Sequence, residues 1–343
     1  MKTWFSDRAS ENLVSSLQNL FTSSVSPLVV AALVLLGSAG RTFAVDLKAG
    51  DRVVTVQAGV ELGFKDKPVK VLDRGAEIVL SEVRDPWIGG TAEIDGEKHT
   101  GWVHKREVRR AAVEVKPLPE VTDEASAVVA LGKYQVTVEK DDEGHVQVVE
   151  ATDTGLPDAA LAWLAHFPKL NVVALGGTAV TDEGLKSLAA LKTIEMLYLD
   201  RTEVSDAGLE HLAGLENLVV LVLERSRVTG AGLKTLAPLV ELRTLNLAWC
   251  PIKDDELEAC LKFENLEVAT LNKSGINGEG LVHLRPLKKL RVLNISDNPV
   301  DEENLLHLQG APTLKMLYVR GFKTTDATIQ SLKDTLISCA VYR

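Results

Sequence analysis

The sequence predicts an α/β solenoid of stacked repeats, preceded by a small all-β domain. Two observations predict the solenoid. A leucine motif recurs every 24 residues without insertion or deletion, and each unit switches from period-two to period-three spacing of its apolar residues. A third observation predicts the all-β domain: residues 46–115 hold short β-rich runs separated by Gly, Pro and Asp, with no helical period.

The motif LxxLxL defines the frame of each repeat. Its first residue falls at Leu170, Ile194, Leu218, Leu242, Leu266, Leu290 and Leu314. One step earlier gives Val146, and LISCAVYR at the C-terminus predicts a closing strand. The repeats are therefore expected over residues 146–343.

Each unit predicts one strand followed by one short helix. Leu197 and Leu199 alternate with outward positions, whereas Leu185 and Leu188 are three residues apart, as on one face of a helix. Caps are expected at Thr181, Ser205, Thr229 and Asp301, and first-turn carboxylates that favour the helix dipole at Asp182, Asp206 and Asp326. A single unit cannot bury its own apolar face, so stacking is expected to create a shared core.

This pattern resembles the leucine-rich repeat family. The segment LRVLNISDNPV (Leu290 to Val300) matches LxxLxLxxNxL, with Asn298 at the ladder position. Elsewhere that position holds Thr178, Thr202, Ser226, Cys250 or Ser274. The phrase VTDEGLKSL is most similar to the subtype with a polar or cysteine ladder, which occurs in bacterial exported proteins and in eukaryotic F-box proteins. The resemblance implies a curved α/β solenoid with a parallel sheet on the concave side and helices on the convex side.

Residues 1–44 predict a signal peptide or a membrane anchor. The run LVVAALVLL at 28–36 has signal-peptide length, and Thr42-Phe43-Ala44 offers a cleavage site after Ala44. An uncleaved anchor would use residues 25–40. Either alternative predicts an exported, periplasmic or cell-surface protein, and a misassigned start or a buried apolar helix is the competing interpretation.

Residues 46–115 resemble the bacterial SH3-like domain, a small β-barrel. Trp87, the Asp95-Gly96 turn and the strand Gly101-Trp102-Val103 carry the resemblance. It implies binding of cell-wall glycan or peptide through a surface that includes Trp87, or a role as a spacer. Trp102 is expected in the core of the domain. Residues 116–124 predict a linker, and residues 125–145 an N-terminal cap for the solenoid.

Composition and motifs argue against catalysis and against nucleic acid. The formal net charge is −10, whereas phosphate binding needs a basic face. The sequence has no GxSxG, HExxH, phosphate loop or CxxC, so neither a cofactor nor a metal is expected. His211, His283 and His307 share one repeat position, where a solvated helix flank is favoured over a metal site. The three cysteines are expected as buried free thiols.

The same repeat frame locates a candidate binding surface. Because Leu197 and Leu199 point into the core, the residues between and after them point into the concavity, and the same phase in every unit predicts a grid on the order of 40 Å long. Its candidate binding residues are Tyr198, Asp200, Arg201, Val222, Glu224, Arg225, Asn246, Trp249, Asn272, Asn294, Asp297, Tyr318 and Arg320. Trp249, Tyr198, Tyr318 and Arg225 are the expected hot spots, because aromatic and arginine side chains dominate interface energies.

The resulting hypothesis is a non-catalytic binding or scaffold protein of the cell envelope. Its partner would be a protein, a peptide or a cell-wall glycan, with membrane contact only through an uncleaved anchor. A second hypothesis is an intracellular F-box-like adaptor that recruits substrates to a ubiquitin ligase. A third is an enzyme that uses the concave face, although no acid–base pair stands out.

Overall fold

The computed structural model describes residues 52–56, 60–64, 67–72, 76–84, 87–104, 107–111, 118–336 and 339–343. The predicted signal or anchor segment, residues 1–44, lies outside the described residues. So does most of the segment that joins the two predicted domains, residues 112–117.

The N-terminal domain is a seven-stranded antiparallel sheet in the order β3-β2-β6-β5-β4-β1-β7. Its strands are β1 (Arg52–Thr55), β2 (Val60–Phe64), β3 (Lys67–Leu72), β4 (Glu77–Arg84), β5 (Trp87–Ile94), β6 (Glu97–His104) and β7 (Val108–Arg110). The predicted turn joins β5 to β6, with positive φ at both Asp95 and Gly96, as tight hairpins require. Its resemblance to an SH3-like barrel remains a prediction.

The two tryptophans of this domain lie on the outer face of β5 and β6. Trp87 is 49% exposed, and its ring meets His104 edge to face with centroids 5.3 Å apart. Trp102 was expected in the core, but the core contains its neighbour Val103, and Trp102 instead lies over Gly89. Strand alternation explains the difference, because consecutive residues of β6 point to opposite faces.

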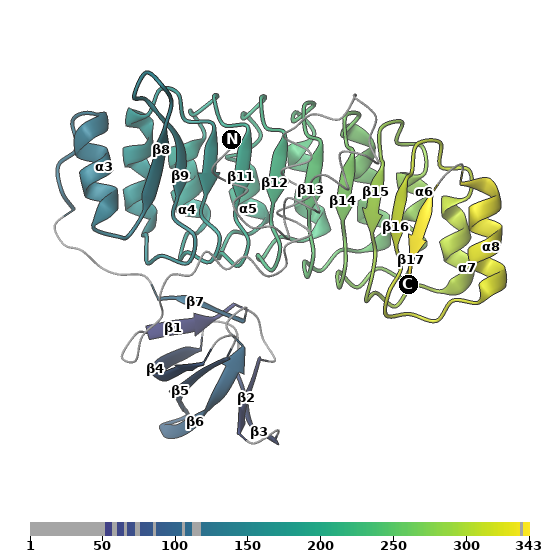
Figure 1. The fold of residues 1–343 in the computed structure, drawn as a ribbon, viewed down its shortest axis with the longest axis horizontal. Helices are drawn as coiled ribbons and strands as arrows, with labels where there is room; N and C mark the ends of the chain where they lie inside the picture. Colours follow the sequence, from purple (N-terminus) through teal and green to yellow (C-terminus); the bar gives the residue numbers. More distant parts are fainter. Residues whose placement is uncertain are drawn as a thin grey trace.

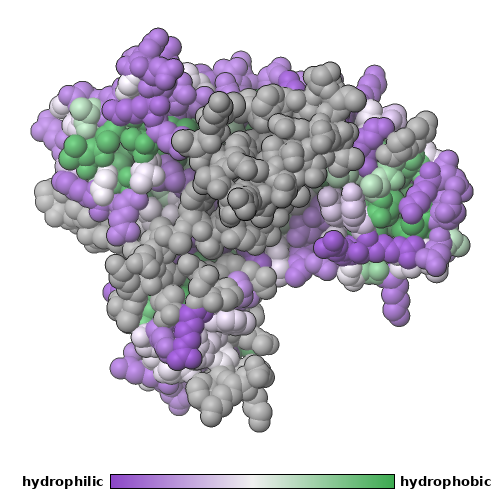
Figure 2. All heavy atoms as spheres, in the orientation of Figure 1, coloured by the Kyte–Doolittle hydropathy of each residue, from purple (hydrophilic) through white to green (hydrophobic). Residues whose placement is uncertain are grey.

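The predicted cap coincides with a helix and a hairpin. Helix α3 (Glu124–Gly132) begins at Asp123, which forms a capping box with Ser126. Strand β8 (Thr137–Lys140) then pairs antiparallel with β9 (Val146–Glu150), so the first edge of the solenoid sheet is covered. Figure 2 shows an apolar patch beside α3. On the helix itself, Val129 is 68% exposed.

The solenoid sheet has ten strands in sequence order, from β8 to β17, and the strands from β9 onward are parallel. The strands after β9 are β10 (Val172–Ala174), β11 (Met196–Tyr198), β12 (Val220–Val222), β13 (Thr244–Asn246), β14 (Val268–Thr270), β15 (Val292–Asn294), β16 (Met316–Tyr318) and β17 (Ala340–Tyr342). Each step from β10 to β17 is 24 residues, as the leucine motif predicts, and β17 is the predicted closing strand. Figure 1 shows this sheet in front of the helical segments.

The convex segments are short helices, as predicted, and several of them are 3₁₀ helices rather than α-helices. They are η3 (Asp158–His166), α4 (Asp182–Leu185), η4 (Lys186–Leu188), α5 (Asp206–Leu209), η5 (Gly230–Leu236), η6 (Asp254–Lys262), α6 (Leu281–Leu284), α7 (Glu302–Leu305), η7 (Leu306–Leu308) and α8 (Asp326–Thr335), where η marks a 3₁₀ helix. A 24-residue unit leaves room for only about one to three helical turns after its strand and two connections.

A single core runs the length of the solenoid. The motif leucines lie in it, and Leu197, Leu221 and Leu293 are fully buried. Beside it runs the polar ladder, in which Thr178 and Thr202 donate to carbonyls three residues earlier, and Cys250 Sγ contacts the Leu223 carbonyl at 3.1 Å. All three cysteines are buried and free, as expected.

The first-turn aspartates do more than favour a helix dipole. Asp182 accepts from the backbone N–H of Ser205 at 2.7 Å and from its hydroxyl at 2.6 Å, one repeat further on. Asp158 binds Thr181 in the same way, and Asp206 binds Thr229. These bonds form a convex ladder that ties four successive repeats together. Asp301, a predicted cap, makes no side-chain cap bond.

Among the described residues, an ion pair joins the two domains. Arg109 of β7 donates to Glu203, in the turn after β11, at 3.0 Å, and Arg227 lies 3.6 Å from the same carboxylate. None of the described helices combines the length and the apolarity that crossing a bilayer demands.

Candidate functional site

The register of the parallel strands aligns the predicted grid residues in straight rows across the concave face. The central row is Glu150, Ala174, Tyr198, Val222, Asn246, Thr270, Asn294, Tyr318 and Tyr342. Tyr198, Asn246 and Asn294 therefore lie in one line, as the leucine frame predicts. Neighbouring strands are about 4.8 Å apart, so a ligand lying along the row would meet a different side chain at each step.

A second row, two residues earlier in each strand, is almost wholly apolar. This apolar row is Val148, Val172, Met196, Val220, Thr244, Val268, Val292 and Met316. Met196, Val220 and Val222 form a buried cluster separate from the main core, with Tyr198 packed against it. Thr244 is the polar exception; it is fully buried, and its hydroxyl has no hydrogen-bond partner among the described residues.

Four of the candidate binding residues, together with Lys273 at the same repeat position, lie at the turn that ends each strand, not on the strand itself. Arg201, Arg225, Trp249, Lys273 and Asp297 all have positive φ, between 55° and 63°. Non-glycine residues seldom adopt this conformation, and here it recurs every 24 residues. It directs these side chains along the edge of the sheet, and we call this line of residues the rim.

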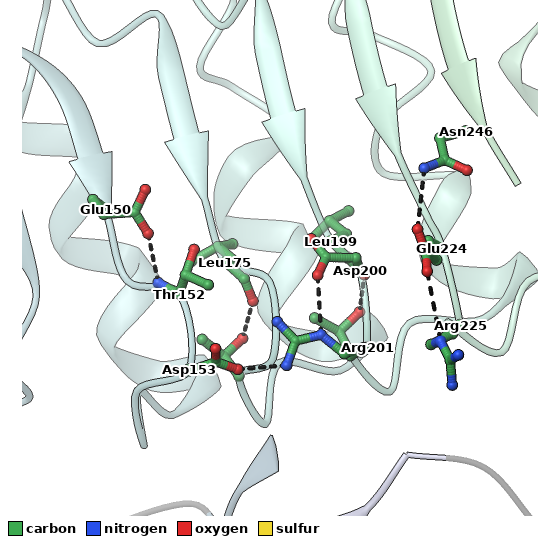
Figure 3. Close-up of polar contacts among 12 residues, drawn as sticks. Glu150, Thr152, Asp153, Leu175, Leu199, Asp200, Arg201, Glu224, Arg225 and Asn246 are labelled. Carbon is green, nitrogen blue, oxygen red and sulfur yellow. Dashed lines mark hydrogen bonds and ion pairs between the residues drawn. The ribbon is translucent and has the colours of Figure 1, made fainter. Parts of the chain in front are cut away.

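At the rim, Arg201 reaches back across a whole repeat. Its guanidinium lies 2.6 Å from Asp153 and 3.2 Å from Asp200, as Figure 3 shows. Gly177, at the equivalent position of the intervening repeat, has no side chain to obstruct this ion pair. A Cβ there would lie 2.0 Å from Asp153 Oδ1 and 2.9 Å from Arg201 Nη1. Burial lowers the pKa of Arg201, but the carboxylates of Asp153 and Asp200 raise it by more than burial lowers it. The guanidinium therefore stays charged.

Further along the rim, Trp249 lies between two cations. The guanidinium of Arg225 is 3.9 Å from the indole centroid, and the Lys273 ammonium is 4.2 Å away. Arg225 is only 5% exposed, so little of this predicted hot spot is accessible to a partner. Lys273 also lies 3.9 Å from Asp297, which continues the chain of contacts.

Carboxylates gather at the N-terminal end of the concave face. Glu224 lies 3.5 Å from Arg225 and accepts from Asn246 at 3.4 Å, and Glu150 accepts from the Thr152 N–H at 2.9 Å (Figure 3). Burial raises the pKa of Glu150 and of Glu224, and repulsion from Asp200 raises both further. Burial also raises the pKa of Tyr198, so its phenol stays neutral.

A third row was missed by the sequence reasoning because it comes just before the strands. This leading row contains Glu195, Val219, Arg243, Glu267, Arg291 and Lys315, joined by a continuous run of backbone hydrogen bonds. Glu267 lies 3.2 Å from Arg243 and 4.0 Å from Arg291, and it is 5% exposed. Charged residues at a constant interval of 24 could have revealed it.

The remaining predicted residues lie towards the C-terminal end of the face. Tyr318 stacks on Tyr342 with centroids 4.7 Å apart, and Asn294 caps the Ser296 N–H. Asn272 is half-buried and Arg320 is exposed, both in a trailing row that also holds Asp200 and Glu224. Trp87, the predicted surface residue of the N-terminal domain, is not on this face.

The geometry suits recognition better than catalysis. The carboxylates of Asp153, Asp200 and Glu224 each accept a hydrogen bond from a neighbouring side chain, so each is held in place by the face itself. Among the described residues, one group has metal-ligand geometry, Asp141, Glu143 and His145 in the β8–β9 hairpin. There Asp141 Oδ1 already accepts from the backbone of the other two, so these contacts are those of a tight turn.

A comparison with protein-family models matches the family described as Leucine Rich repeat at residues 168–189 and 242–259. The matched segments are therefore leucine-rich repeats, and both follow the 24-residue frame. A comparison with curated proteins finds no match.

Three solved structures with similar backbones share little sequence with this chain. Internalin C2 from Listeria monocytogenes aligns with 22% identity and a TM-score of 0.40, over 52% of this chain and 80% of that one. The plant peptide hormone receptor RGFR1 in complex with RGF2 gives 17% and 0.39, over 60% and 36%. The TLR13–ssRNA13 complex gives 18% and 0.39, over 55% and 30%. At these TM-scores the likenesses carry no functional argument.

Proposed function

We propose that this chain is a non-catalytic binding or scaffold protein of the cell envelope, which recognises a protein or peptide on the concave face of its solenoid. One observation carries the proposal. The strand register presents unbroken rows of side chains, and these rows differ from repeat to repeat although the core beneath them does not. Such a surface offers specificity without a pocket.

The envelope location rests on the sequence of residues 28–36 and on the resemblance of residues 46–115 to an SH3-like domain. A cell-wall glycan is a less suitable ligand for the concave face, because the apolar row has few hydrogen-bonding groups for sugar hydroxyls.

The test is a comparison of three full-length proteins with an envelope extract. The concave variant carries Tyr198→Ala and Asn294→Ala, and the convex control carries Val240→Ala and Leu261→Ala, two apolar residues that are 53% and 38% exposed. The wild type and the convex control should retain the same protein, and the concave variant should lose at least about tenfold in affinity. Equal retention by all three would reject the concave face as the binding surface.

A further inference from the structure

The two edges of the solenoid sheet differ in how they are protected. At the first edge, β8 carries the exposed charged residues Glu139 and Lys140, and its pairing with β9 shifts register between them. Exposed charge and irregular pairing both hinder the addition of another strand. At the other edge, β17 has the sequence AVY, with no charge, no proline and no register shift against β16. The described part of the chain places no strand on the outer side of β17 (Figure 1).

The backbone of β17 directs hydrogen-bonding groups away from β16. On the inner side, the Ala340 N–H donates to the Lys315 carbonyl at 2.8 Å, and the Tyr342 carbonyl accepts from Val319 at the same distance. Because consecutive residues of a strand direct their backbone groups to opposite sides, the N–H and C=O of Val341 face outward. Each strand from β10 to β16 also has three residues, so the outer side of β17 offers as much backbone as an interface between repeats.

The side chains of this edge are apolar and differ in size. On the concave side, Tyr342 stacks on Tyr318 with ring centroids 4.7 Å apart, so one ring face is covered while the residue stays 37% exposed. Ala340, two residues earlier on the same side, is exposed. On the opposite side of the sheet, Val341 packs against the end of the main core. An added strand would therefore meet an open ring face, a space above a small side chain, and an apolar residue that extends the core.

These three residues are complementary to themselves. When two copies of β17 pair antiparallel about a two-fold axis, Val341 lies opposite its own counterpart in the second copy. Residues paired with their backbone groups facing each other exchange both N–H···O bonds, which satisfies the outward groups of both copies. One residue away, Tyr342 of each copy lies opposite Ala340 of the other, so each ring covers a small side chain.

We propose that the chain forms a symmetric dimer through β17, in which the two solenoid sheets join into one continuous sheet. A two-fold axis perpendicular to the sheet keeps both concave faces on the same side. A partner that carries the same epitope twice would then bind both faces at once. The inference goes beyond the proposed function and does not depend on it, because the pairing needs no ligand.

The test begins with the mass of the full chain in solution, measured by sedimentation equilibrium from about 1 to 200 μM, a range that detects micromolar association. We expect a reversible dimer. Val341→Pro removes the outward N–H and leaves the inner bonds of β17, a position where an edge strand accepts proline. It should lower the association constant at least about tenfold. Amide hydrogen exchange of the C-terminal peptide should slow with concentration in the wild type and not in the variant.

A second variant changes only an exposed side chain. Ala340→Glu would place a carboxylate against the electron-rich ring face of Tyr342 in the other copy, so the association constant should again fall at least about tenfold. The matched control, Ala231→Glu, makes the same substitution at an exposed position of the convex segment η5 and should leave the dimer unchanged. Thermal unfolding of all three variants checks that the fold is retained.

The remaining outcomes decide against the inference. A chain that is monomeric over the whole concentration range overturns it, and so does a dimer that both edge variants leave intact, because another surface then holds it. Protection of the C-terminal amides in a monomer, appearing only when an envelope extract is added, would mean that β17 takes a strand from a different protein. The concave variant, Tyr198→Ala with Asn294→Ala, should still dimerise, so failure of the proposed function and failure of this inference are distinguishable.

Discussion

The convex and concave sides of the solenoid share one 24-residue register but use it in opposite ways. On the convex side the chemistry repeats, because Asp158, Asp182 and Asp206 each bind a hydroxyl residue of the following repeat. On the concave side the same register gives Tyr198, Val222 and Asn246 in succession. Stacking requires the first pattern and is indifferent to the second. Repeats within one chain therefore distinguish residues that hold the solenoid together from residues that are free to recognise a partner.

The largest expected contrast is between two asparagines. Asn298 is buried at the ladder; its amide donates to the carbonyls of Leu271 and Ile295, and its oxygen accepts from the Ser274 and Gly275 N–H groups. Asn298→Ala leaves these backbone groups unsatisfied and should cost about 3–5 kcal/mol of unfolding free energy. Asn272→Ala, on the concave face, should cost no more than about 0.5 kcal/mol.

Urea unfolding of both variants measures this contrast. A loss below about 1 kcal/mol for Asn298→Ala would show that water satisfies the freed groups, and the ladder would then be no more constrained than the concave face.

A second contrast concerns two glycines of one repeat. A Cβ on Gly208 would lie 2.3 Å from Asp182 Oδ1, which is held in place by Ser205, so Gly208→Ala should cost about 1–3 kcal/mol. A Cβ on Gly214 would meet the Lys192 ammonium at 2.4 Å, the far end of a flexible side chain that can move away. Gly214→Ala should therefore be nearly neutral. Equal thermal unfolding midpoints for the two variants would contradict the convex ladder.

The sequence predicts the strands and their register better than the rim, for a physical reason. Leucine spacing encodes strand phase directly, so the strands, the closing strand and the line through Tyr198, Asn246 and Asn294 follow from it. The rim does not follow, because strand alternation ends where positive φ begins at Arg201, Arg225 and Trp249. Nothing local marks those residues, since arginine and tryptophan are unusual in that conformation.

Side-chain contacts between different repeats are equally difficult to predict from the sequence. The Arg201–Asp153 pair spans 48 residues and depends on Gly177 between them. The role of Asp182 is visible only when its distance to Ser205 of the next repeat is known. A single sequence gives composition and periodicity, whereas these contacts depend on how neighbouring repeats stack on one another in three dimensions.

A smaller effect is expected where the ladder accepts substitutes. Cys250 occupies the position that Ser226 and Ser274 fill in neighbouring repeats, and its thiol contacts the Leu223 carbonyl. Cys250→Ser should change the unfolding free energy by about 1 kcal/mol or less, because a hydroxyl can donate to the same carbonyl. Burial raises the pKa of this thiol to about 11, so it should also resist alkylation at neutral pH until the protein unfolds. Rapid alkylation of native Cys250 would show that the ladder opens readily.

The smallest effect tests whether the carboxylates at the N-terminal end of the concave face, such as Glu224, destabilise the folded protein. Burial, and then repulsion from Asp200, raise the pKa of Glu224 in the folded state above its unfolded value of about 4.3. A raised carboxyl pKa means that the folded state prefers the protonated form, so this stabilisation is present below pH 4 or so and is lost as pH rises through the folded pKa.

Glu224→Gln removes that loss and keeps an acceptor for Asn246. The variant should match the wild type near pH 4 and exceed it near pH 7 by about 0.5 kcal/mol, a small gain because the side chain is 37% exposed and its charge is screened. Denaturant midpoints at both pH values measure this gain, with Glu279→Gln on the convex side as the control. A variant less stable than the wild type at pH 7 would mean that the Arg225 ion pair outweighs burial, and that the convex and concave sides are equally optimised for stability.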